Sequence, residues 1–211
     1  FKDRVLGIYV DLGINISDEG EFTKFKDIAK HLGFKVFGIS ALNLINEPVK
    51  IDNLLFVPKV VEYVGKPSPR RKGVRRYIRS LYLSSKPGIA QLVRFGRTYN
   101  TLILSTEALM DLSEGDVKEL SMRGIFIELP IKELSKAALG KRITRFRKVV
   151  NLLVKYFPQV IVTSGASCLR ELWSPHTMIA FLIEIVGFDE HLALASLSSH
   201  PYMLVKGVIS G

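Results

Sequence analysis

Short apolar runs alternate with amphipathic segments along almost the whole 211-residue chain. The runs that predict buried strands cover residues 5–11, 34–40, 53–64, 101–105, 125–129 and 159–163. Helical periodicity lies between or after them, over residues 21–32, 88–97, 114–123, 143–157, 174–186 and 189–199. Strands that alternate with helices indicate a parallel sheet. We therefore predict a single α/β domain over residues 1–211, closed as a TIM-like barrel, although an open doubly wound sheet has the same pattern.

Composition excludes several classes of protein. Cys168 is the only cysteine, which excludes an internal disulfide bond and a cysteine-rich zinc site. No apolar run is long enough to span a bilayer, and no signal-peptide pattern opens the sequence. The sequence also lacks a phosphate-binding P-loop and the glycine spacing of a dinucleotide-binding turn. We expect a cytoplasmic protein that has no membrane partner.

Positive charge is concentrated in two segments of the chain. The net charge is +10 at pH 7. Residues 66–99 hold ten basic and no acidic side chains, residues 141–155 hold six basic and no acidic ones, and the remainder is net acidic. Such patterning favours a polyanionic partner, and nucleic acid is the obvious one.

The first basic segment predicts an exposed loop over residues 66–73 and then a helix over residues 72–83. One side of this helix would be apolar, through Val74, Ile78, Leu81 and Tyr82. The opposite side would be basic, through Lys72, Arg75, Arg76 and Arg79. Such a helix would bury its apolar stripe and present four cations in a row.

The second basic segment predicts a similar helix over residues 143–157. Its core face would consist of Ile143, Phe146, Val150, Leu153, Val154 and Phe157. The basic residues opposite are Lys141, Arg145, Lys148 and Lys155. Like charges that are adjacent and unpaired cost free energy, which contact with phosphates would offset, whereas a solvated charged face is the simpler alternative. The predicted RNA contacts are Arg70, Arg71, Lys72, Arg75, Arg76, Arg79, Arg94, Arg97, Lys141, Arg145, Lys148 and Arg170.

Two carboxylates end predicted strands, where barrel enzymes place catalytic groups. Asp11 ends the first strand and Glu128 lies in the strand over 125–129, while His176 is in the first turn of a predicted helix. The four histidines are scattered, without the close spacing of a metal-binding pair. We therefore expect Asp11 and Glu128 to be structural or hydrogen-bonding groups. The alternative is a metal-dependent phosphoesterase that uses Asp11, Glu128 and His176.

The segment over residues 161–179 (IVTSGASCLRELWSPHTMI) carries the clearest family signature. A strand runs into Ser164, Gly165 and Ala166, and after a short loop Ser174 and Pro175 open a helix. This arrangement resembles the C-terminal signature of the ribonuclease P protein subunit of the thirty-kilodalton class, called protein component three in archaea. The Val-Asp-Leu that contains Asp11 and the strand that contains Glu128 are also similar to segments of that family. Where the family commonly has an arginine before the Ser-Pro pair, this chain has Trp173, and Arg170 lies three residues earlier.

The resemblance implies a barrel related to metal-dependent phosphoesterases but without a metal or catalytic residue of its own. It implies an RNA-binding subunit of ribonuclease P, which supports the catalytic RNA in removing the 5′ leader of precursor tRNA. The implied partners are ribonuclease P RNA, precursor tRNA and a small RNA-recognition-like protein subunit, and magnesium would serve the catalytic RNA. A general RNA-binding module shares the basic segments and remains an alternative.

Overall fold

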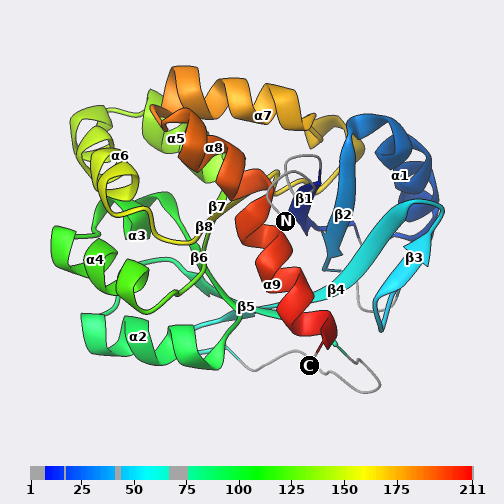
Figure 1. Cartoon of the computed structure of the whole chain (residues 1–211), viewed down its shortest axis with the longest axis horizontal. Coiled ribbons are helices and arrows are strands. Elements are labelled where there is room, and N and C mark those ends of the chain that lie inside the picture. The colour runs from blue at the N-terminus through cyan, green and yellow to red at the C-terminus, as the bar shows by residue number, and fades with distance from the viewer. Residues whose placement is uncertain (1–7, 17, 41–43, 67–75, 211) are drawn as a thin grey trace.

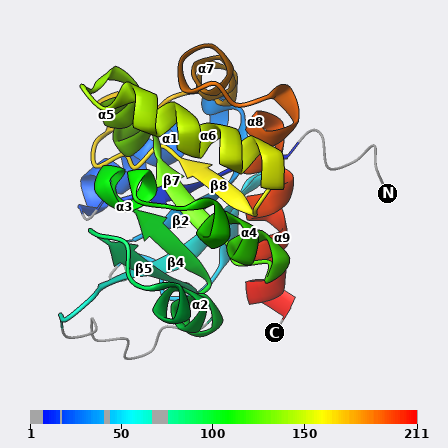
Figure 2. The ribbon, with the colours of Figure 1, turned by 90° about the vertical axis from the view of Figure 1, so that its left-hand side faces the viewer.

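The computed structural model describes residues 8–16, 18–40, 44–66 and 76–210. Its main feature is a nearly closed barrel of parallel strands, which confirms the predicted TIM-like fold (Figures 1 and 2). The strands follow one another in chain order: β1 (Tyr9–Ile14), β2 (Phe34–Ile39), β4 (Leu54–Tyr63), β5 (Ile78–Leu83), β6 (Thr101–Leu104), β7 (Ile127–Pro130) and β8 (Val160–Thr163). The short β3 (Val49–Ile51) pairs antiparallel with β4, outside this order.

The first and last strands meet at a seam. In the described part of the chain no strand ladder joins β8 to β1. Instead, the Asn15 N–H donates to the Ala166 carbonyl at 2.8 Å, and the Ser164 N–H donates to Asp11 Oδ1 at 3.1 Å. These bonds connect positions that are more than 150 residues apart in the sequence, and they join the first strand of the barrel to the last.

Helices surround the barrel. They are α1 (Glu19–Leu32), α2 (Ile89–Thr98), α3 (Thr106–Met110), α4 (Glu114–Met122), α5 (Ile131–Leu139), α6 (Ile143–Tyr156), α7 (Pro175–Phe181), α8 (Glu190–Leu197) and α9 (Ser199–Ser210). A 3-10 turn, η2 (Leu169–Glu171), precedes α7, and a π-helical segment, η3 (Leu182–Val186), follows it. None of the helices within the described ranges is long and apolar enough to cross a membrane.

The predicted helix over residues 72–83 is wrong where the structure describes it. Residues 78–83 form β5, which pairs with β4 on one side and β6 on the other. Ile78, Ser80, Leu81 and Leu83 are all buried, so both faces of this strand are covered. A strand buried on both faces lacks a clean alternation of apolar and polar residues, and pairing within the sheet decides its conformation. The predicted helical residues Lys72, Val74 and Arg75 lie outside the described residues, as do Arg70 and Arg71 of the predicted loop.

Several elements differ from the sequence prediction in extent. The predicted last helix over 189–199 is followed by a further helix, α9, which includes the His200-Pro201 pair that resembles a turn in sequence. Proline is tolerated there because the first turn of a helix has no partner for its N–H groups. The short β3, α3 and α5 also had no predicted counterpart, since each is three to nine residues long.

The barrel interior is closed at one end by α9, which lies across the strands in Figure 1. Leu204 and Val205 of α9 pack against an apolar cluster supplied by the amino-terminal halves of the strands. The strand residues in that cluster are Val10, Leu12, Val36, Val57, Ile78 and Ile161. A second, larger core lies between the strands and the surrounding helices, for example where Phe25 of α1 meets Phe37 and Phe56. The opposite end of the barrel, at the carboxyl ends of the strands, is therefore the end that can hold a ligand-binding site.

Candidate functional site: the barrel mouth and the basic surface

A polar layer lies directly above the apolar cluster inside the barrel. Successive side chains of a strand point to opposite faces, so a residue two positions further along faces the same interior. Two positions beyond apolar residues of the lower layer, the strands place polar side chains, in the pairs Val57 and Lys59, Ile78 and Ser80, Phe126 and Glu128, and Ile161 and Thr163. The barrel thus changes from apolar to polar within one layer of its interior.

Lys59 and Glu128 form a buried ion pair at the centre of this layer. The Lys59 ammonium lies 2.5 Å from Glu128 Oε1, and each residue is only 1% exposed. Lys59 Nζ also donates to the Leu12 carbonyl at 2.8 Å. Thr163 Oγ1 donates to Glu128 Oε1 at 3.3 Å, and Thr101 Oγ1 lies 3.2 Å from Oε2. The pair compensates its own charge and is hydrogen-bonded to its surroundings, which is what permits its burial.

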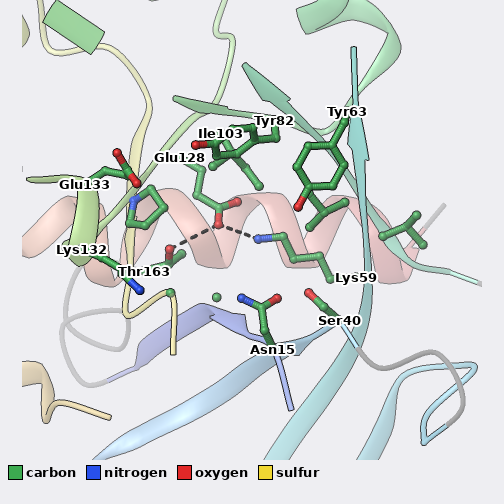
Figure 3. A pocket seen from close by; sticks show the side chains of 15 residues that line it. Asn15, Ser40, Lys59, Tyr63, Tyr82, Ile103, Glu128, Lys132, Glu133 and Thr163 are labelled. Atoms are coloured by element: carbon green, nitrogen blue, oxygen red, sulfur yellow. Dashed lines mark hydrogen bonds and ion pairs between the residues drawn. The ribbon is translucent and has the colours of Figure 1, made fainter. Parts of the chain in front are cut away.

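Above the ion pair, the barrel opens into a pocket of about 390 Å³, which we call the barrel-mouth pocket (Figure 3). It lies at the carboxyl ends of the strands, the position of ligand sites in TIM barrels. Lys59 and Glu128 line it from below. The other residues that line the pocket are Gly13, Asn15, Ser40, Val60, Val61, Tyr63, Tyr82, Ile103, Pro130, Lys132, Glu133, Thr163 and Gly165.

The pocket has two walls of different character. Tyr63 and Tyr82, on the neighbouring strands β4 and β5, have ring centroids 5.4 Å apart at an interplanar angle of 47°. Burial, reinforced by the negative charge of Glu133, raises the pKa of Tyr82 above its ordinary value of 10.0, so its hydroxyl remains a proton donor at neutral pH. Asn15 and Ser40 lie on the other side of the ion pair in Figure 3. The pocket can therefore offer both an aromatic surface and hydrogen-bonding groups to one ligand.

Asp11 is buried beside the seam. Its Oδ1 accepts the backbone N–H groups of Gly13 at 3.0 Å and Ser164 at 3.1 Å. Burial raises the pKa of the Asp11 carboxyl above 3.8, although hydrogen bonds from Ser164 and Gly13 oppose this rise. Asp11 thus fixes the conformation of the turns that follow β1 and β8, which agrees with the structural role expected from the sequence.

The family-signature residues form the turn after β8. Gly165 has φ +66°, a conformation that glycine adopts without strain. At Gly13, a Cβ atom would lie only 2.7 Å from Thr163 Cβ and 2.8 Å from the Gly165 nitrogen, so the seam requires a glycine there. Further on, the Ser174 side chain accepts the Thr177 N–H at 3.2 Å, and α7 begins at Pro175, as predicted. The signature therefore describes a backbone arrangement at the barrel mouth.

The residues of the phosphoesterase alternative do not form a metal site. Across the described ranges, no three His, Cys, Asp or Glu side chains are grouped so that they could hold a metal ion. Both oxygens of Glu128 are engaged within the polar layer, while His176 is exposed on α7 with its ring 6.2 Å from that of Tyr9. Asp11, Glu128 and His176 are therefore not brought together, and their arrangement does not fit a metal.

Arg79 does not belong to a free basic face, contrary to the sequence prediction. Its Nε donates to Glu62 Oε1 at 2.8 Å, and its guanidinium stacks over the Tyr99 ring at 4.4 Å. Arg79 therefore stabilises the neighbouring strands β4 and β5. Arg76, just before β5, is exposed, as are Arg94 and Arg97 on α2.

The predicted unpaired basic face of α6 is also wrong in part. Arg145 contacts Asp111 Oδ1 at 2.6 Å and the Met110 carbonyl at 2.8 Å. The Lys155 ammonium contacts Glu114 Oε1 at 2.8 Å. Asp111 directly follows α3 and Glu114 begins α4, about 30 to 40 residues earlier in the chain, so inspection of the α6 sequence alone could not reveal these acidic partners.

Four cations near the start of α6 remain available to a partner. Lys141, Arg142, Arg147 and Lys148 are exposed and form no ion pair with another described residue. Lys141 and Arg142 also line a shallow depression together with Lys136. Arg170, on η2, is exposed as well. The first turn of α6 contains no acidic residue, so its unpaired N–H groups add to the positive potential.

The sequence prediction missed the residues that make the barrel mouth a pocket. Lys59 is a charged residue in the middle of the apolar run of β4, and this was the signal that could have identified it. Asn15 and Ser40 directly follow β1 and β2, where barrel ligands bind. Tyr63 and Tyr82 resemble ordinary strand residues, and only the register of β4 with β5 places them opposite each other.

In sequence, no protein-family model and no curated protein matches this chain. In structure, the chain is similar to one in the cryo-EM structure of archaeal Ribonuclease P with mature tRNA, with a TM-score of 0.54. The similarity covers 95% of this chain and 91% of the other at 16% sequence identity. At that identity the likeness establishes a common fold over essentially the entire length of both chains.

Proposed function

We propose that this chain is a non-catalytic, RNA-binding protein subunit of ribonuclease P. In this role it supports the catalytic RNA while that RNA removes the 5′ leader of precursor tRNA. Its partners would be the ribonuclease P RNA, precursor tRNA and a small RNA-recognition-like protein subunit. Magnesium would serve the RNA, and the protein would contribute cations that screen phosphate repulsion.

The observation that carries this proposal is the agreement between the sequence signature and the fold. The Ser164 to Pro175 signature resembles the thirty-kilodalton ribonuclease P subunit, and the complete barrel is similar to a chain of an archaeal ribonuclease P particle. The two comparisons are independent, because one depends on residue identities in a short segment and the other on backbone coordinates over 95% of the chain.

Attraction between exposed cations and phosphates is how the chain would bind RNA. Lys141 and Arg142, just before α6, and Arg147 and Lys148, in its first two turns, carry four positive charges that no described residue pairs. Each cation that meets a phosphate releases condensed counterions, which favours binding at low salt. Arginine can in addition make bidentate contacts with phosphate or stack on unpaired bases. The start of α6 is therefore the surface of the described chain that we assign to RNA.

The test is cleavage of precursor tRNA by the cognate catalytic RNA at limiting magnesium, with the small partner subunit present. Adding this protein should stimulate cleavage. The triple variant Lys141→Gln, Arg142→Gln, Lys148→Gln should stimulate less, and its RNA affinity should depend less steeply on salt. The loss should be about 0.7–0.9 logarithmic units of slope for each contact removed.

A matched control removes three charges from the other side of the barrel, around α1 and β3. Lys24, Lys35 and Lys50 are exposed there and form no ion pair with any described residue. Their replacement by Gln should leave stimulation and salt slope nearly unchanged. Equal losses in both variants would show that net charge matters and that the α6 surface is not the RNA site. Absence of stimulation by the folded wild-type chain would refute the proposed function.

A further inference from the structure

The barrel-mouth pocket is not explained by an RNA-binding surface on α6. It has a volume of about 390 Å³, within the range of pockets that hold small ligands, and it lies where barrels bind them. We propose that this pocket binds a nucleobase, with the ring against Tyr63 and Tyr82 and its polar edge toward Asn15 and Ser40.

The aromatic side of the pocket fits a flat ring. Tyr63 is 46% exposed and Tyr82 is partly exposed, so both have faces available to a ligand. Their rings are inclined at 47°, and a planar ligand could stack on one ring while its edge contacts the other. Every nucleobase has a π-face, and stacking on tyrosine is a common way for proteins to bind unpaired bases.

The opposite side of the pocket carries polar side-chain groups that have no hydrogen-bond partner among the described residues. Ser40 Oγ is buried and forms no hydrogen bond with any other described residue. A buried hydroxyl without a partner is costly, and a ligand that bonds to it would remove that cost. The Asn15 side chain is exposed and makes no hydrogen bond to another described residue. Serine and asparagine both donate and accept, which matches the mixed donors and acceptors on the edge of a base.

The charged side chains at the floor and rim of the pocket indicate which ligand charge it favours. Lys59 and Glu128 neutralise each other, so the floor is polar without net charge and suits a neutral ring. At the rim, Lys132 is exposed without an ion pair to a described residue. Glu133 is already engaged by Thr106 and Lys136. The ammonium of Lys66 also lies 5.1 Å from the centre of the Tyr63 ring. Lys132, which lines the pocket, would accompany the phosphate of a nucleotide whose base enters it.

A nucleobase can come from two sources, a free nucleotide or an unpaired nucleotide within RNA. The second source rests on the proposed function, whereas the first does not. The experiment is calorimetric titration of the full chain with AMP, GMP, CMP and UMP separately, and with a single-stranded RNA of mixed sequence. The same titrations are made with Tyr63→Ala and with Asn15→Ala, both of which alter exposed side chains and should leave the fold intact.

Two control variants change similar groups at the other end of the barrel. Met203→Ala shortens an apolar side chain that is 51% exposed on α9, and Asn53→Ala removes an exposed amide before β4. At least one monophosphate should bind the wild type. Each pocket variant should bind that monophosphate about fivefold or more weakly, while the control variants should bind it as tightly as the wild type does. If only the RNA binds and shows the same sensitivity, the base is read within RNA.

The remaining outcomes either overturn the pocket proposal or separate it from the proposed function. If Tyr63→Ala and Asn15→Ala change the affinity for neither the monophosphates nor the RNA, the pocket does not bind a base, even where RNA binding through α6 persists. If the α6 triple variant loses RNA binding while monophosphates still bind in the pocket, both assignments stand as separate sites. If monophosphates bind but the chain fails to stimulate ribonuclease P, the pocket proposal survives and the proposed function does not.

Discussion

The two ends of the barrel interior are built from the same strands but have opposite character. At the amino-terminal end, Val57, Ile78 and Ile161 pack against Leu204 and Val205 of α9, and that end is closed. At the carboxyl-terminal end, the strands present the Lys59–Glu128 pair and the open barrel-mouth pocket. Advancing two residues along a strand is sufficient to pass from one to the other. The comparison teaches that the same strands stabilise the barrel at their amino-terminal ends and offer a binding pocket at their carboxyl-terminal ends.

The largest expected effect comes from breaking the ion pair at the boundary between the two ends. Glu128→Leu leaves the Lys59 ammonium buried without its counterion, so the free energy of unfolding should fall by about 3–5 kcal/mol. The double variant Lys59→Met, Glu128→Leu replaces both charges with apolar groups and should recover most of that loss. Urea denaturation of the wild type, both single variants and the double variant measures the coupling. A double variant as unstable as the sum of the two single variants would show that the pair is not coupled.

The next effect tests the closed end. Leu204→Ala removes a side chain that is only 5% exposed from the cluster between α9 and the strands. The resulting cavity should lower the free energy of unfolding by about 2–3 kcal/mol, the lower part of the range for such changes. Met203→Ala on the same helix, at a side chain that is 51% exposed, should change it by less than about 0.5 kcal/mol. Similar effects of both variants in thermal or urea unfolding would contradict the assignment of α9 as the closing element.

The two ends should also respond to pH in opposite directions. Burial raises the pKa of Asp11, near the open end, so its contribution to stability is present below pH 3.8 and is lost as the pH rises through the pKa of the folded state. Burial lowers the pKa of His200, at the closed end, although its Nδ1 lies 2.8 Å from the Val160 carbonyl. The contribution of His200 is therefore present above pH 6.5 and is lost as the pH falls through its lowered pKa.

Asp11→Asn and His200→Asn separate these two contributions. The stability of Asp11→Asn relative to the wild type should rise with increasing pH above 3.8. The stability of His200→Asn relative to the wild type should rise as the pH falls below 6.5. Urea unfolding between pH 4 and pH 8 gives both curves. Parallel curves for a variant and the wild type would show that the residue replaced does not titrate with folding.

The smallest expected effect is at the rim of the open end. Tyr63 is 46% exposed and its ring lies beside that of Tyr82, so Tyr63→Ala should lower the free energy of unfolding by less than about 1 kcal/mol. A larger loss in thermal unfolding would mean that the aromatic wall is part of the core. In that case any loss of ligand binding by this variant would have to be separated from loss of fold.

Much of the architecture could be predicted from the sequence. The apolar runs at β1, β2, β4, β6, β7 and β8 and the amphipathic pattern of α6 predicted a parallel α/β fold, but an open doubly wound sheet has the same pattern as the barrel that the structure shows. The start of α7 followed from Ser174 and Pro175. The segment of β5 could not be assigned in this way, because Ile78–Leu83 is buried on both faces and its apolar residues also fit a helical period.

The candidate site was much harder to predict. Glu128 was identified by its place in a strand, but its partner Lys59 is 69 residues away and only the closed sheet brings them together. The same holds for Arg79 and Arg145, whose acidic partners lie 17 and 34 residues away. Charge counted along one helix cannot reveal contacts made across the fold. The prediction was thus best where local periodicity decides the structure, and poorest where ion pairs connect distant segments.

The seam between β1 and β8 gives the barrel-mouth pocket a second consequence. Gly13 and Asn15 line the pocket from one end of the strand order, and Thr163 and Gly165 line it from the other. A molecule held between them would act as a noncovalent cross-link between the first and last strands, which are otherwise joined there by few hydrogen bonds. The unfolded chain has no pocket to bind such a molecule, so saturation at about one hundred times its dissociation constant would raise the free energy of unfolding by about 2.7 kcal/mol. Occupancy of the pocket would thereby be coupled to the closure of the entire barrel.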